Sequence, residues 1–145
     1  MRLPETFAVD ASVGVKLFIE EDGSDKAEQL FALLGREPPH VIAVPDLFFI
    51  ECANVFRSRV HRRLMTAERA REAFAVLRFL PLQSVSSSEL APFALDLALG
   101  HGLSVYDGTY LALAERLGVP LVTADGKLVK KLVEAGRKAI LLKKG

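Results

Sequence analysis

The sequence is poor in cysteine and in long apolar runs, and each shortage excludes a class of protein. Cys52 is the only cysteine among 145 residues, so the chain has neither an internal disulfide nor a pair of cysteine ligands for a metal ion. The apolar runs, such as Val44-Pro45 into Leu47–Ile50, are far shorter than the roughly 18 residues that a membrane-spanning helix needs. Glu5 and Asp10 interrupt the first apolar stretch, so we expect no signal peptide. We therefore expect a cytoplasmic protein without a membrane partner.

What the sequence does contain is enough apolar material for a folded core. Half of the residues are hydrophobic, which excludes a disordered or low-complexity chain. A length of 145 residues suits one domain and leaves little room for two. Neither an internal repeat nor a linker divides the chain. We therefore predict a single domain over residues 1–145.

The net charge of +1 conceals an uneven distribution of charge. Residues 1–51 hold ten acidic and four basic side chains, whereas residues 52–145 hold eight acidic and fifteen basic ones. Seven of the arginines lie between Arg57 and Arg78. A basic half can attract a polyanion, but it can equally be a solvated surface, and charge alone does not decide between the two.

Short apolar segments alternate with amphipathic ones along the chain. Strands are predicted at residues 6–10, 41–44, 82–85, 103–105, 121–123 and 139–142. Helices are predicted between them, at about residues 12–20, 24–34, 46–62, 66–80, 86–99, 107–117 and 125–135. Because the strands show little polar alternation, both faces of their sheet should be covered by helices. The pattern predicts an α/β fold with a parallel sheet.

Three aspartates follow predicted strands: Asp10, Asp107 and Asp125. The carboxyl ends of parallel strands form the crevice in which such sheets bind their ligands, so these side chains are candidates for one site. The alternative is that Asp107 and Asp125 cap the helices that follow them, a role worth about 1 kcal/mol each. The local pattern leaves both interpretations open.

Glu51 does not fit an ordinary surface position. It lies in the middle of a predicted helix, and its neighbours on the same face include Leu47, Phe48 and Val55. A buried carboxylate without a partner is costly, so Glu51 either pairs with an arginine, extends to the surface or joins the aspartates. Clustered carboxylates repel one another, and a hard cation such as Mg²⁺ or Mn²⁺ is the usual way to offset that repulsion.

Four segments together resemble a known family. Each contains one of the four carboxylates, which follow one another at increments of 41, 56 and 18 residues, and the segments are Val9–Ser12, Pro45–Glu51, Leu103–Tyr110 and Leu121–Leu128. They resemble the PIN domain, and within it they are most similar to the VapC-type toxins of prokaryotic toxin–antitoxin pairs. The resemblance spans nearly the whole chain. Gly108 stands where the family more often has a small residue with a side chain, and we expect this departure to have little effect.

The resemblance implies a three-layer α/β/α fold and a metal-dependent ribonuclease. It implies that the catalytic and metal-binding residues are the same four, Asp10, Glu51, Asp107 and Asp125, which would hold Mg²⁺ or Mn²⁺. It also implies an RNA substrate, a cognate antitoxin and a homodimer. The apolar helix surface around Phe48 would serve a partner or simply belong to the core.

Other polar residues are weaker candidates. Ser12, Asn54 and Thr123 would act on the substrate or beside the metal ligands. Structural roles explain them about as well: Ser12 as a helix cap, Asn54 as a polar residue at the boundary of a helix face, and Thr123 as a strand residue. Arg57, Arg62 and Arg63 would contact the RNA backbone or form a solvated helix surface. Tyr106 and Tyr110 would stack on bases, but tyrosines beside a parallel sheet more often belong to the core.

Two other functions remain open. One is an RNA-maturation nuclease of the same family, and the other is a PIN-like module that binds RNA or protein without cutting. Metal-dependent turnover separates a nuclease from a binding module. Nucleotide-binding enzymes are excluded, because neither a dinucleotide fingerprint nor a P-loop is present.

Overall fold

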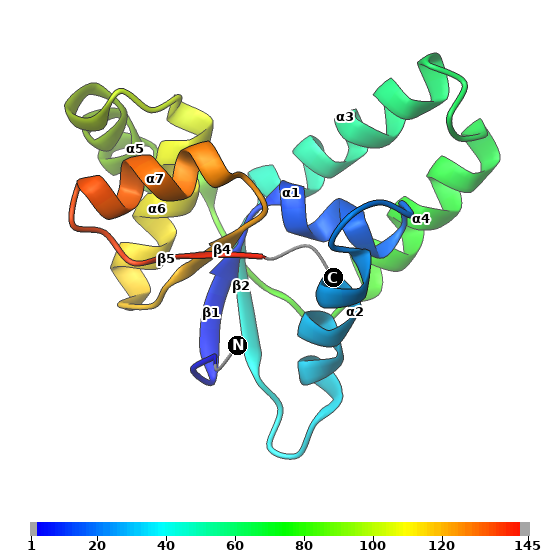
Figure 1. Cartoon of the computed structure of the whole chain (residues 1–145), viewed down its shortest axis with the longest axis horizontal. Coiled ribbons are helices and arrows are strands. Elements are labelled where there is room, and N and C mark those ends of the chain that lie inside the picture. Colours follow the sequence, from blue (N-terminus) through cyan, green and yellow to red (C-terminus); the bar gives the residue numbers. More distant parts are fainter. Residues whose placement is uncertain (1–2, 143–145) are drawn as a thin grey trace.

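The computed structural model describes residues 3–142, in which five strands form one fully parallel sheet. The strands are β1 (Thr6–Val9), β2 (Val41–Pro45), β3 (Gln83–Val85), β4 (Leu121–Thr123) and β5 (Ala139–Leu141). Their order across the sheet is β3-β2-β1-β4-β5, so β1 lies at the centre (Figure 1). The predicted α/β class with a parallel sheet is confirmed.

The central strands are apolar on both faces because helices cover both. Phe7, Ala8 and Val9 of β1 are completely buried. Ala8 pairs with Ala43 of β2 on one side and with Leu121 of β4 on the other. Side chains that point to opposite faces of a strand are thus all removed from water, which is why the sequence shows no polar alternation here.

The helices are divided between the two faces of the sheet. Their bounds are α1 (Ala11–Gly14), α2 (Ser24–Ala32), α3 (Leu47–His61), α4 (Ala67–Phe79), α5 (Ser87–His101), α6 (Val105–Leu117) and α7 (Gly126–Glu134), with 3₁₀ turns at Val15–Leu17 and Leu33–Gly35. Helices α5, α6 and α7 lie on one side, and α1 to α4 on the other (Figure 1). The expected three-layer arrangement is present. No helix within residues 3–142 is long and apolar enough to cross a membrane.

Capping side chains set several of these helix ends. The side chains of Thr66 and Ser86 accept hydrogen bonds from the first turns of α4 and α5, as their sequence positions predict. Gly118 ends α6 in the left-handed conformation, with φ of 67°. The helix predicted at 12–20 is shorter than expected: its N-cap is Asp10 rather than Ser12, and a 3₁₀ turn follows it.

The strand predicted at residues 103–105 is wrong. Leu103 and Ser104 lie in a loop, and Val105 already begins α6. Ser104 is the N-cap of that helix, and its hydroxyl accepts a hydrogen bond of 3.0 Å from the backbone N–H of Asp107. Hydrophobic periodicity cannot distinguish a strand from a helix in so short an apolar segment. The capping serine favours the start of a helix here. Asp107 therefore lies in the first turn of a helix and not at the end of a strand.

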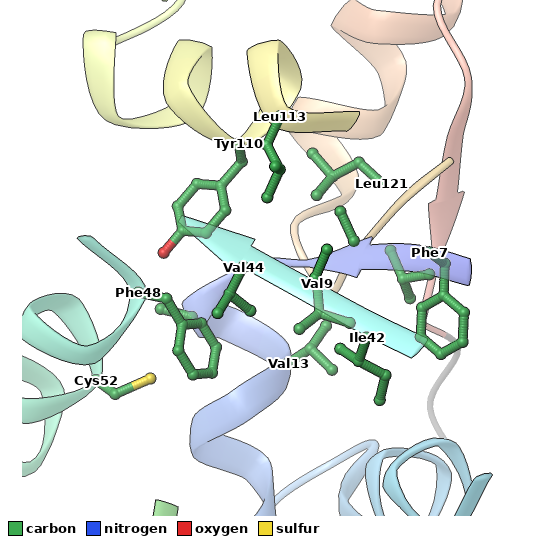
Figure 2. Close-up of a cluster of buried hydrophobic side chains, with 14 of the residues drawn as sticks. Phe7, Val9, Val13, Ile42, Val44, Phe48, Cys52, Tyr110, Leu113 and Leu121 are labelled. Carbon is green, nitrogen blue, oxygen red and sulfur yellow. The ribbon is translucent and has the colours of Figure 1, made fainter. Parts of the chain in front are cut away.

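The core lies between the sheet and the helices on either side of it. Figure 2 shows side chains of β1, β2 and β4 meeting Tyr110 and Leu113 from α6, with Val13 of α1 and Phe48 of α3 also in contact with this cluster. Phe48 and Phe56 are 0% and 2% exposed, so they belong to the core and not to a partner surface. This packing holds α3 and α6 against the sheet.

Candidate active site

The order of the strands places a topological switch point, where sheets of this type have their crevice, at the end of β1. The chain continues from β1 toward β2 and β3 on one side of it, and β4 and β5 occupy the other side. Parallel sheets bind their ligands at such a switch point, beyond the carboxyl ends of the strands. Asp10 directly follows β1, Thr123 is the last residue of β4, and Asp125 begins the turn into α7.

A network of hydroxyl groups holds Asp10 in place. One carboxylate oxygen of Asp10 accepts a hydrogen bond from Ser12, and the other accepts one from Thr123. The backbone N–H of Ala124 donates to the Ser12 hydroxyl at 2.9 Å, and the N–H of Asp125 donates to the Thr123 hydroxyl at 3.1 Å. These bonds join the ends of β1 and β4. They place Ser12 and Thr123 beside Asp10, as expected for two of the three weaker polar candidates.

Asp10 is a buried acid with an altered pKa. Its side chain is only 6% exposed. Burial raises its pKa to about 6, although the hydrogen bonds from Ser12 and Thr123 act in the opposite direction, and the negative charge of Asp107 contributes to the rise. A carboxylate that is both buried and close to another carboxylate needs a counter-charge.

Asp125 and Asp107 occupy helix starts in different ways. The Asp125 carboxylate caps α7 by accepting hydrogen bonds from the N–H groups of Lys127 and Leu128, at 3.0 and 3.2 Å. The capping interpretation is therefore correct for Asp125, but only one of its oxygens is used. Asp107 is not a cap. Burial raises its pKa, and the charge of Asp125 raises it further, while the hydrogen bond with Ser104 and the ammonium group of Lys131 lower it.

Glu51 reaches the same region from α3. It is half-buried, and it forms none of the three ion pairs found among residues 3–142, which excludes the interpretation that an arginine neutralises it. Burial raises its pKa, the hydroxyl of Tyr110 lowers it, and the charge of Asp107 raises it. Asp107 thus interacts electrostatically with each of the other three carboxylates.

The donor set fits a hard divalent cation. All four side chains offer carboxylate oxygens, and neighbouring negative charges raise the pKa of Asp10, Glu51 and Asp107, a repulsion that a cation would relieve. The side chains are not drawn together into a closed cage: within residues 3–142, no three His, Cys, Asp or Glu side chains form a preassembled metal site. Mg²⁺ keeps several of its waters and takes few protein ligands, so an open arrangement suits it.

The remaining candidates lie farther out on α3. Asn54 is exposed and forms no hydrogen bond with any of the four carboxylates. Arg57, Arg62 and Arg63 are exposed toward the tip of the arm that α3 and α4 form, which projects from the sheet in Figure 1. They present positive charge on the arm whose helix α3 also carries Glu51.

Two residues near the carboxylates carried no clear signal in the sequence. The Tyr110 hydroxyl lies close to Glu51, and Lys131 places its ammonium group near Asp107 while donating to the Gly102 carbonyl at 3.1 Å. The i to i+3 spacing from Asp107 to Tyr110, on one helix face, is the signal that would have indicated the tyrosine.

A sizeable cavity lies elsewhere and contains none of the four carboxylates. Its volume is about 690 Å³, and it lies between α2, the turn after it and β5.

Comparison with known proteins agrees with the geometry. The PIN domain family matches residues 7–132. The chain is 35% identical over 125 residues to Ribonuclease VapC3 of Pyrobaculum aerophilum, which covers 85% of this chain and 92% of that protein. It is also 35% identical over 126 residues to Ribonuclease VapC12 of Mycobacterium tuberculosis, covering 84% and 88% of the two chains.

A solved structure shares the fold. A toxin–antitoxin complex from Klebsiella pneumoniae contains a chain that aligns with a TM-score of 0.61 and 18% identity, over 95% of this chain and 98% of that one. Because the family match and the two relatives each cover most of the sequence, this protein belongs to the PIN domain family.

Proposed function

We propose that this protein is a metal-dependent ribonuclease and the toxin of a toxin–antitoxin pair. The observation that carries the proposal is the electrostatic coupling of Asp10, Glu51, Asp107 and Asp125 at the carboxyl edge of the sheet. The 35% identity to two proteins named as VapC ribonucleases supports RNA as the substrate. Residues 1–145 would act as one domain in the cytoplasm.

The four carboxylates would hold Mg²⁺ or Mn²⁺. When bound, the cation would supply Lewis-acid polarisation of the phosphodiester and a nucleophile at neutral pH. Asp10 is the most constrained of the four, because its two oxygens accept hydrogen bonds from Ser12 and Thr123. Those hydroxyls keep the Asp10 oxygens oriented before the cation arrives, which limits the reorganisation needed at the site.

Glu51 is the group that we assign to orient the attacking water and take its proton. It comes from α3, whereas Asp10 and Asp125 follow the sheet strands, so it faces the crevice from a different direction. Its pKa is raised by burial and by Asp107, which makes it a better proton acceptor than a solvated glutamate. Arg57, Arg62 and Arg63 would contact the RNA backbone along the same arm. Asn54, which is exposed on α3, would contact the substrate.

The partners would be an antitoxin and a second copy of the chain. The toxin–antitoxin complex from Klebsiella pneumoniae shares the fold, which supports the first partner by analogy. Several large apolar side chains are exposed on α3, α4, α5 and the turn between α3 and α4, and they offer surface for both contacts: Ile50, Leu64, Val76, Phe79, Phe93, Leu95 and Leu99. Phe79 is 87% exposed, and its contact with water carries a free-energy cost that a partner covering it would remove.

The first experiment is cleavage of total cellular RNA by the purified, antitoxin-free protein. We expect discrete products with Mg²⁺ or Mn²⁺ and none with EDTA. Asp107→Asn should lower the rate at least about 100-fold, because it removes a charge from the centre of the carboxylate cluster. Asp96→Asn makes the same change at an exposed position of α5 and should leave the rate unchanged.

The outcome separates the three candidate functions. Cleavage that requires metal and Asp107 establishes a nuclease, and mapping the cut ends then separates a toxin target from a maturation site. A folded, metal-loaded protein that binds RNA without cutting it would instead be a binding module.

A further inference from the structure

Tyr110 places an unpaired hydroxyl inside the core next to the acidic crevice. The residue is on α6, three positions after Asp107, and it is 2% exposed. Its phenolic oxygen is buried and lacks a hydrogen bond of regular geometry. Figure 2 shows the ring hanging from α6 against the sheet, with the oxygen directed away from α6 and toward α3, where Phe48 lies.

A phenylalanine would fill this volume without the cost of an unpaired hydroxyl. Buried polar groups are nearly always hydrogen-bonded, so an exception needs a partner within reach. The Glu51 carboxylate is the acceptor that lies next to the Tyr110 hydroxyl. Burial raises the pKa of Tyr110, and its interaction with Glu51 and the charge of Asp10 raise it further. The phenol therefore stays protonated and available as a donor.

Helix α6 thus acts on Glu51 in two opposite ways. Asp107 repels the Glu51 carboxylate, whereas the Tyr110 hydroxyl lies close enough to attract it. The two residues are three apart, so they lie on neighbouring positions of one helix face. One helix supplies both the negative charge at the centre of the cluster and the donor that balances it.

We propose that Tyr110 is a positioning residue that donates its O–H to the Glu51 carboxylate and fixes the orientation of this carboxylate at the crevice. The proposal rests on the proposed function, because it gives Tyr110 a role in the metal-dependent site. Tyr110 itself touches neither the RNA nor the cation. Its effect passes through Glu51.

The test is Tyr110→Phe, which removes one oxygen and keeps the ring in the core. We expect Mn²⁺ to bind about tenfold more weakly in a calorimetric titration, as is typical when a residue that orients a metal ligand is lost. The KM for RNA should stay unchanged while kcat falls. The melting temperature in EDTA should change little, because the ring and its packing in the core are retained.

Two further variants make the result specific. Tyr106→Phe makes the same change on the same helix at a side chain that is 61% exposed, and it should leave Mn²⁺ affinity and kcat unchanged. In a Glu51→Gln background, Tyr110→Phe should cause no additional loss of Mn²⁺ affinity, because the carboxylate through which it acts is absent.

Mn²⁺ affinity separates this inference from the function on which it rests. Wild-type affinity in Tyr110→Phe, or an equal loss in the Glu51→Gln background, would overturn the role of Tyr110 even if the protein cleaves RNA. A wild-type protein that binds Mn²⁺ but does not cleave RNA would overturn the proposed function alone. A wild-type protein that binds no Mn²⁺ would overturn both.

Discussion

Asp10 shows how one residue can oppose folding and serve a site. It lies at the end of the central strand, is 6% exposed, and has a pKa raised by burial to about 6 from an ordinary value of 3.8. The hydroxyls of Ser12 and Thr123 offset only part of the desolvation cost. A buried carboxyl group that lowers stability in this way is a candidate for a functional role.

The raised pKa predicts a pH dependence in EDTA. The folded protein binds a proton at Asp10 more tightly than the unfolded chain does, so this contribution to stability is complete below about pH 4 and is lost as pH rises to about 6. The loss should be on the order of 2 to 3 kcal/mol in the free energy of unfolding. Asp10→Asn should lack this decline and be the more stable protein at pH 7 in EDTA, while losing nuclease activity.

Urea denaturation of both proteins at pH 4, 5, 6 and 7 measures this difference directly. Other carboxylates titrate in the same pH range, so the informative quantity is the unfolding free energy of the wild type minus that of the variant. If the unfolding free energies of the two proteins change with pH in parallel over the whole range, Asp10 is not the buried acid that titrates.

At the scale of elements, the packing of α6 on α5 positions Asp107. Gly108 lies where the two helices meet, and a Cβ at this position would come within 2.6 Å of the Ala94 carbonyl oxygen. The expectation that glycine at this position has little effect is therefore wrong for this chain. The missing side chain lets α5 approach α6 directly beside a residue of the acidic cluster.

Gly108→Ala should lower the free energy of unfolding by about 1 to 3 kcal/mol, because a backbone carbonyl cannot move aside as a flexible side chain can. That corresponds to a fall in melting temperature of about 2 to 4 °C per kcal/mol for a chain of this size. Gly126→Ala is the matched control, since open space surrounds its Cβ position in α7. It should be neutral or slightly stabilising, because alanine has a higher helix propensity than glycine. Equal melting temperatures for the two variants in EDTA would contradict the close approach.

At the scale of the whole molecule, positive charge lies on an arm away from the sheet. Arg62 and Arg63 are exposed at the turn between α3 and α4, and neither forms one of the ion pairs found in the described part of the chain. Unpaired arginines on a projecting surface suit a polyanion, since each neutralised phosphate releases a counterion.

Reversing Arg62 and Arg63 to glutamate should weaken RNA binding about tenfold or more and flatten its dependence on salt. Fluorescence anisotropy in EDTA measures binding without cleavage, over about 50 to 200 mM NaCl. The double reversal of Lys26 and Arg36, on the α2 side of the molecule, makes the same change in net charge and should have a much smaller effect (Figure 1). Equal losses in the two double variants would mean that net charge, and not the arm, governs binding.

Much of the architecture follows from local patterns in the sequence. The strands at 6–9, 41–45 and 121–123 are short apolar runs, and caps such as Thr66 and Ser86 set helix starts through hydrogen bonds within one turn. Asp10 and Asp125 could be placed at one edge because parallel strands align their carboxyl ends. These inferences need only contacts that are close in sequence or dictated by the sheet.

The tertiary structure decided what depends on packing between distant segments. Asp107 was expected at the end of a strand but lies in a helix, and only the docking of α6 on the sheet brings it near Asp10 and Glu51. The polar side chain close to Glu51 is a tyrosine 59 positions away and not an arginine, which no local spacing reveals. By itself the sequence determined which residues are acidic and that two of them, Asp10 and Asp125, follow strands at one edge of the sheet. How strongly their charges interact was decided by burial, because the pKa of a carboxylate depends on the water and the charges that the folded chain leaves around it.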